Sequence, residues 1–111
     1  MSLKQMERIY KMKKVVLLCA GGASTGMLVK KLESVAEKLD KKYSFSAYGI
    51  AEATTVASDA DIVLLGPQVS YQLEDIKKQL SGVKVAAVDM IDYGTMNAER
   101  ILKQISSMIG E

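Results

Sequence analysis

The sequence contains no histidine, no tryptophan and only one cysteine, and each absence removes a class of function. Without histidine there is no Cys–His nucleophile pair, no phosphohistidine on this chain and no His-ligated metal site. A single cysteine also leaves too few ligands for a structural zinc site and rules out an internal disulfide. Chains of this kind are typical of a reducing compartment, so we expect a cytoplasmic location. Cys19 is therefore the strong nucleophile that the sequence offers at neutral pH.

The chain also lacks a strong charge bias and long apolar runs. Its net charge of +2 over 111 residues, without a basic stripe interleaved with aromatic residues, argues against a nucleic-acid partner. No apolar run is long enough to cross a bilayer or to serve as a secretory signal. The length allows one domain. We expect residues 1–12, rich in Lys and Met, to form a loosely ordered extension, and residues 13–111 to form a single domain.

The most informative stretch begins with a short apolar strand over Val15–Leu18, which runs directly into Cys19. A loop of small residues follows, and from about residue 24 to residue 40 the apolar spacing is helical. Backbone N–H groups and the positive end of a helix dipole should then point at the sulfur. Such surroundings favour a thiolate and can hold a phosphoryl group on it. The candidate phosphoryl-binding loop comprises Ala20, Gly21, Gly22, Ala23, Ser24, Thr25 and Gly26.

The same stretch could also have a purely structural role. A lone cysteine is most often a small buried hydrophobe, and glycines are common in ordinary turns after strands. However, a core cysteine has no need of glycines beside it. The combination at a strand-to-helix junction therefore favours a functional loop.

The rest of the chain alternates between strand and helix patterns. Residues 44–49 alternate as an edge strand does, whereas residues 62–65 are apolar throughout, like a strand covered on both faces. A fourth strand is predicted over 83–88 and a loop over 89–97. Helices are predicted over about 51–57, from an N-cap at Ser70 to residue 80, and over 98–109, and the core face of the first helix is predicted to comprise Leu28, Leu32, Val35, Ala36 and Leu39.

This alternation predicts an α/β fold, a three-layer sandwich with a four-stranded parallel sheet and helices on both faces. If the second strand lies at an edge, the strand order is 2-1-3-4. The point where the order reverses then falls between strands one and three, and Cys19 lies there, at the carboxyl edge where such folds bind ligands. Residues 66–70 and 89–97 should emerge at the same edge.

Small protein tyrosine phosphatases also have a cysteine at the start of a phosphate-binding loop between a strand and a helix. Those enzymes need an arginine six residues after the cysteine, where this chain has Thr25. They also need an acid, and the loop offers none. We therefore expect hydrolysis to be slow and the loop to carry a phosphoryl group. A cysteine-dependent phosphatase or reductase and a flavin- or nucleotide-binding module stay open as alternatives, the latter because Ser24-Thr25-Gly26 loosely resembles a flavin phosphate loop.

Three segments together resemble the B component (enzyme IIB) of bacterial sugar phosphotransferase systems, in the lactose/cellobiose/chitobiose class. They are Val16–Leu28, the Gly66-Pro67-Gln68 turn and Tyr93-Gly94 before the last helix, and the resemblance spans residues 13–109. It implies that Cys19 takes a phosphoryl group from a phosphohistidine A component. The group then passes to a sugar held by the membrane permease component, at the inner face of the membrane.

The resemblance adds Pro67, Gln68 and Tyr93 as residues at the rim of the site. It implies neither a cofactor nor a metal. We do not expect this chain to bind sugar by itself, because its sequence provides few aromatic side chains for a sugar pocket.

Overall fold

The computed structural model describes residues 12–20 and 25–110, which form one α/β unit. The chain alternates between strands and helices as the sequence predicts. The elements are β1 (Lys13–Cys19), α2 (Thr25–Lys38), β2 (Tyr43–Gly49), the 3-10 helix η1 (Ile50–Glu52), α3 (Ala53–Val56), β3 (Ile62–Leu65), the 3-10 helix η2 (Pro67–Gln72), α4 (Leu73–Gln79), β4 (Lys84–Ala87), α5 (Met90–Gly94) and α6 (Ala98–Ile109).

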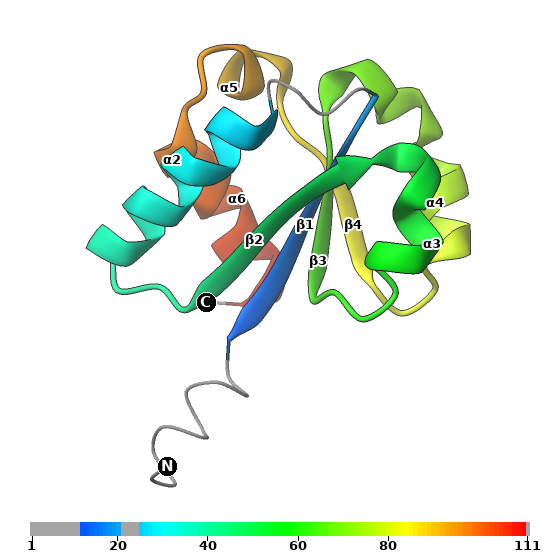
Figure 1. The fold of residues 1–111 in the computed structure, drawn as a ribbon, viewed down its shortest axis with the longest axis horizontal. Helices are drawn as coiled ribbons and strands as arrows, with labels where there is room; N and C mark the ends of the chain where they lie inside the picture. The colour runs from blue at the N-terminus through cyan, green and yellow to red at the C-terminus, as the bar shows by residue number, and fades with distance from the viewer. Residues whose placement is uncertain (1–11, 21–24, 111) are drawn as a thin grey trace, which may run out of the picture.

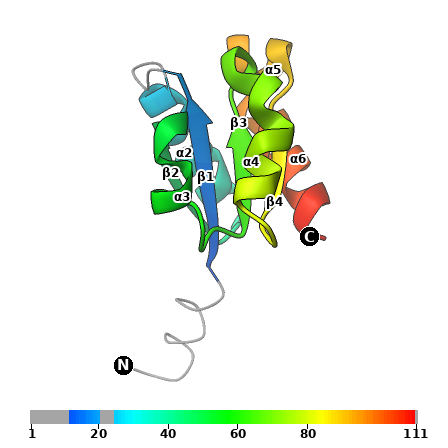
Figure 2. The ribbon, with the colours of Figure 1, turned by 90° about the vertical axis from the view of Figure 1, so that its right-hand side faces the viewer.

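The four strands form a parallel sheet in the order β2-β1-β3-β4, which confirms the predicted topology. In Figure 1 helices α2, α5 and α6 lie on one side of this sheet and α3 and α4 on the other. Figure 2 shows the strands pointing the same way, with α5 beyond their carboxyl ends. The start of β1 and the end of α6 lie at the opposite end.

Alternate side chains of the central strands supply two separate cores. Val15 and Leu17 of β1 pack with α2 and α6, whereas Val16 and Leu18 pack with α3, η2 and α4. All four side chains are at most 2% exposed. Continuous apolar strands of this kind are what a parallel sheet covered on both faces requires.

Strand β2 occupies one edge, as its alternating pattern predicts. Tyr43 and Phe45 are buried, while Ser44 and Tyr48 are exposed. The buried pair meets edge to face, with ring centroids 6.0 Å apart. Tyr43 and Phe45 thus contribute to the core beneath α2 and α6, whereas Tyr48 lies at the surface.

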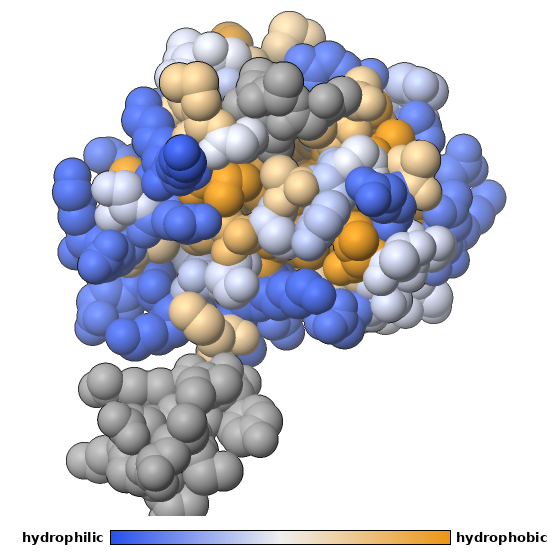
Figure 3. All heavy atoms as spheres, viewed as in Figure 1, coloured by the Kyte–Doolittle hydropathy of each residue, from blue (hydrophilic) through white to orange (hydrophobic). Residues whose placement is uncertain are grey.

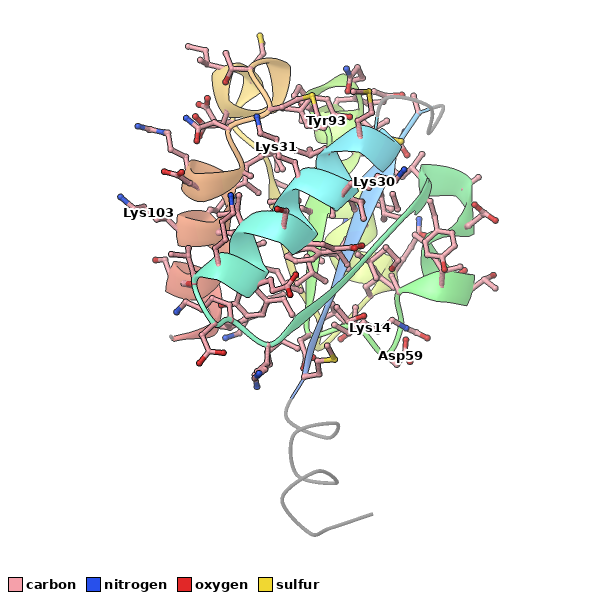
Figure 4. The ribbon with its side chains drawn as sticks, turned by 60° about the vertical axis from the view of Figure 1, so that its left-hand side comes forward. Lys14, Lys30, Lys31, Asp59, Tyr93 and Lys103 are labelled. Carbon is pink, nitrogen blue, oxygen red and sulfur yellow. The ribbon has the colours of Figure 1, made fainter. Side chains whose placement is uncertain are left out.

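The end of β1 opposite Cys19 is tied to the loop before β3. The Lys14 ammonium lies 2.6 Å from the Asp59 carboxylate, and the Lys14 backbone N–H donates to Asp61 at 2.7 Å. Figure 4 shows Lys14 and Asp59 pointing toward each other at this end. The Lys14 side chain lowers the pKa of the exposed Asp59 carboxyl, because it donates a hydrogen bond to the charged form.

Three local predictions are wrong, and one falls outside the described residues. Leu39 follows the last residue of α2 and is 54% exposed, so it does not continue the core stripe. Ser70 is not an N-cap: it lies within η2, and its hydroxyl donates to the Pro67 carbonyl. Residues 90–94, predicted as loop, form helix α5. The predicted extension over residues 1–12 lies, apart from Met12, outside the described part of the chain.

Candidate functional site

Cys19 is the last residue of β1, at the carboxyl edge of the sheet where the strand order reverses. It pairs with Gly49 at the end of β2, and on its other side the Gly66 N–H donates to the Leu18 carbonyl at 2.9 Å. The cysteine therefore lies between β2, which ends in Gly49, and β3, which Gly66 follows. Such neighbours leave the strand ends beside the sulfur without side chains.

The Cys19 side chain is 4% exposed and forms no disulfide. Because side chains alternate along a strand, it is directed to the same face as Val15 and Leu17, the face covered by α2 and α6. Its sulfur lies 3.9 Å from the Tyr48 carbonyl oxygen, a long contact in which the thiol donates. A group that reacts with this sulfur must therefore approach it closely from the carboxyl edge.

The predicted phosphoryl-binding loop follows the cysteine directly. Ala20 is exposed, and Gly21, Gly22, Ala23 and Ser24 lie outside the described residues. Helix α2 begins at Thr25, and a Cβ on Gly26 in its first turn would meet no atom of the described residues outside this helix within 4 Å. The first turn holds no acidic residue, so its N–H groups face no carboxylate from this helix. The start of α2, which is the positive end of its dipole, is thus at the same edge as Cys19.

The rim residues predicted beside the cysteine gather around Gly66. A Cβ at this position would lie 3.1 Å from Oε1 of Gln68 and 3.5 Å from the Tyr93 ring. Pro67 begins η2 and is half-buried, and Gln68 is exposed. Tyr93, in α5, is half-buried against the core beneath α2 and α6, and its ring lies beside Gly66. The structure thus brings Gln68 and Tyr93 together, one strand away from Cys19.

Helix α5 is the feature of this edge that the sequence pattern missed. The Asp89 carboxylate accepts hydrogen bonds from the backbone N–H groups of Ile91 and Asp92, at 2.9 and 3.1 Å. Asp is a favoured N-cap residue, and this capping signal was present in the sequence. The helix holds Met90 and Ile91 at 73% and 71% exposure.

Within the described residues no three of the Cys, Asp and Glu side chains are grouped so that they could hold a metal ion. None of the helices described there is long and apolar enough to cross a membrane. Glu52, near the cysteine edge, accepts a hydrogen bond from the Gly49 N–H at 3.3 Å. The described groups at this edge include the Cys19 thiol, the start of α2 and the Glu52 carboxylate.

Comparison with protein families gives one match that covers most of the chain. Residues 14–104 match the family model described as the lactose/cellobiose-specific IIB subunit of the phosphotransferase system. The matched range includes Cys19, the loop after it and all of the rim residues. It begins one residue after the start of β1 and ends within α6.

Relatives over nearly the whole chain have names of the same kind. The oligo-β-mannoside-specific EIIB component of Bacillus subtilis is 31% identical, over 88% of this chain and 97% of that protein. The cellobiose-specific EIIB component of Lactococcus lactis is 32% identical, over 87% of this chain and 96% of that protein. The lactose-specific EIICB component of Staphylococcus epidermidis is 30% identical over 83% of this chain, which spans 16% of that longer protein.

Solved structures agree with the fold. The cellobiose-specific IIB component from Borrelia burgdorferi superposes with a TM-score of 0.74, at 32% identity, and the match covers 88% of this chain and 92% of the other. The lactose-specific IIB domain from Streptococcus pneumoniae superposes with a TM-score of 0.71 at 19% identity, over 85% and 97% of the two chains, a likeness that concerns the fold alone.

Proposed function

Because this chain belongs to the lactose/cellobiose-specific IIB family of sugar phosphotransferase systems, we propose that Cys19 is its phosphoryl carrier. IIB components of this family are phosphotransferases that act in sugar uptake. The observation that carries the proposal is the position of the chain's only cysteine, at the carboxyl edge between β2 and β3 and directly before the loop that leads into α2.

The first reaction is acceptance of a phosphoryl group from a phosphohistidine of an A component. The Cys19 sulfur attacks phosphorus, the S–P bond forms and the N–P bond breaks. The imidazole leaves with the electron pair of that bond, and its nitrogen takes up the proton that the thiol loses. Backbone N–H groups of residues 20–26 and the start of α2 stabilise the charge on the transferred group. The hydroxyls of Ser24 and Thr25 add donors.

The second reaction is donation to a sugar held by the membrane permease component. A sugar hydroxyl oxygen attacks phosphorus, the S–P bond breaks and the hydroxyl proton returns to the thiol. Thr25 occupies the position where a phosphatase has its arginine, and residues 19–26 contain no acid to activate water. The phosphocysteine should therefore persist until the permease component is reached, at the inner face of the membrane.

Replacement of Cys19 by Ser tests the proposal. The protein is incubated with phosphoenolpyruvate, the general phosphocarrier proteins and an A component of the lactose/cellobiose class, and its intact mass is measured. We expect the wild-type chain to gain the mass of one phosphoryl group and the Cys19→Ser chain to gain none. Thr55→Ser, an exposed change in α3, is the matched control and should behave as the wild type does. A Cys19→Ser protein that still accepts the group would refute the assignment.

A further inference from the structure

A hollow of about 540 Å³ lies between α2, the turn that follows it, and α6. The two helices run side by side on the same face of the sheet (Figure 1). The apolar part of the lining consists of Val35, Leu39 and Leu102. A volume of this size and apolar walls are both typical of sites that bind small molecules. None of the described lining residues belongs to the cysteine edge, so the hollow is separate from the site of phosphoryl transfer.

The wall of the hollow at Leu39 is held in place by the backbone. Leu39 continues the apolar spacing of α2, yet its side chain is 54% exposed. Directly after it, the Lys41 N–H donates to the Ala36 carbonyl at 2.8 Å and the Asp40 N–H donates to the Glu37 carbonyl at 3.1 Å. With the left-handed backbone of Asp40, at a φ of +55°, these two hydrogen bonds form a Schellman motif. Because the turn is fixed in this way, Leu39 stays at the hollow instead of continuing into the core.

The charged side chains around the hollow are mainly positive. Lys38, Lys41 and Lys103 line it, and among the described lining residues Glu99 alone is acidic. None of the three lysines forms an ion pair within the part of the chain that the structure describes. Figure 4 shows Lys103 extending from α6 into solvent, so its ammonium lies at the rim of the hollow. In Figure 3 the flank that carries α2, at the left, is largely blue, with small apolar areas between the polar side chains.

We propose that this hollow binds a small anionic amphiphile, namely a free medium-chain carboxylate. Its alkyl chain would lie against Val35, Leu39 and Leu102, and its carboxylate would lie among the three lysines. Three ammonium groups around a site with one carboxylate favour an anion over a neutral or a cationic ligand. A second copy of the chain fits less well, because a two-fold interface would place the same lysines against one another. This inference does not depend on the carrier function of Cys19.

Titration of the full chain with three probes of matched chain length tests the proposal. The probes are octanoate, octanol and octyltrimethylammonium, and NMR of the backbone amides follows binding. We expect octanoate to shift the signals of residues 35–41 and 99–106 with a Kd of about 1 mM or below, and to leave those of β3 and α4 unchanged. Octanol should bind more weakly, and the cation more weakly still. Added salt should weaken the binding of octanoate alone, because salt screens exposed charges.

Variants separate the charged part of the site from its apolar part. Lys41→Gln combined with Lys103→Gln should weaken octanoate binding about fivefold and leave octanol binding unchanged. Leu39→Gln changes an exposed side chain and should weaken the binding of both probes. Lys78→Gln, exposed in α4 on the other side of the sheet, is the matched control and should bind both probes as the wild type does. Circular dichroism checks that each variant keeps the fold.

Three results would contradict the proposal. No saturable shift with octanoate, or shifts confined to other residues, would show that the hollow is not a site for this ligand. Equal affinities for octanoate and octyltrimethylammonium would show that the lysines do not select an anion. Signals of residues 35–41 and 99–106 that move with protein concentration and not with octanoate would assign the hollow to a second copy of the chain. Each of these results leaves the carrier function standing, because phosphoryl acceptance by Cys19 is measured separately.

Discussion

At the scale of single residues, the two glycines beside Cys19 differ in what surrounds them. Gly49 and Gly66 both have extended backbone, with φ of −69° and −63°, that alanine can also adopt. A Cβ on Gly49 would meet its nearest atoms at 3.9 Å, an ordinary contact. A Cβ on Gly66 would instead approach Gln68 and Tyr93 at 3.1 and 3.5 Å. The lack of a side chain is therefore important to the packing only at Gly66.

We predict that Gly66→Ala lowers the free energy of unfolding by about 1 kcal/mol, at the low end for overpacking, because the exposed Gln68 amide can move away. Gly49→Ala is the control. It should be neutral or raise the free energy of unfolding by about 0.5 kcal/mol, since alanine restricts the unfolded chain. Urea unfolding of both variants measures the difference. Equal effects of the two substitutions would mean that Gln68 and Tyr93 do not pack over Gly66 as the structure has them.

At the scale of elements, the sequence predicted regular features well and short-range hydrogen bonding poorly. Residues 62–65 are apolar throughout, which indicates a central strand, and residues 44–49 alternate, which indicates an edge strand. The strand order was predicted from these two patterns. Helical periodicity cannot be recognised over five residues, so the sequence pattern missed α5. The first turn of this helix is capped by the carboxylate of Asp89.

Misplaced caps account for the other errors in elements. A serine before an apolar periodic run suggested an N-cap at Ser70, but its hydroxyl donates backward to Pro67 within a 3-10 turn. Leu39 fits the helical spacing of Leu28 and Leu32, yet α2 ends before it, and Asp40 then adopts a φ of +55°. The position of Cys19 at the strand end could be predicted, because it depends on the strand pattern. The approach of Gln68 and Tyr93 to Gly66 depends on tertiary packing that no local pattern encodes.

The N-cap of α5 gives a prediction at this scale. Asp89→Ala removes two hydrogen bonds from the first turn and should cost about 1 kcal/mol of unfolding free energy. Because so short a helix has few other hydrogen bonds, amide hydrogen exchange should accelerate over residues 90–96 and stay unchanged in β1 and β3. Asp75→Ala removes an acidic side chain from the first turn of α4 and controls for the change in charge. Unaltered exchange over residues 90–96 would show that the Asp89 cap does not hold α5.

At the scale of the whole molecule, the Lys14–Asp59 ion pair and the candidate functional site lie at opposite ends of the sheet. The Lys14–Asp59 pair lies at one end of the sheet (Figure 4), with the ends of α2 and α6, whereas the end of β1, the start of α2 and α5 lie at the other (Figure 1). Hollows are described at both ends, and one of about 540 Å³ beside α5 is lined by Asp89, Ile91 and Arg100. Another of about 540 Å³, between α2 and α6, is lined by Leu39, Leu102 and Lys103, all remote from the strand ends. The end of the molecule that carries Cys19 is the one that we propose its partners approach.

The side chains at this end lead to the prediction that the isolated chain binds no sugar. A sugar pocket usually offers aromatic faces and several fixed polar groups around a desolvated ligand. Here the only phenylalanine, Phe45, is in the core, and the sequence has no tryptophan. Tyr48 and Tyr71 are exposed on separate elements, β2 and η2, and Tyr93 packs over Gly66. When the wild-type chain is titrated with cellobiose, chitobiose and lactose, calorimetry and NMR should detect no saturable binding. Saturation by any of the three below about 1 mM would mean that this chain, and not the permease component alone, selects the sugar.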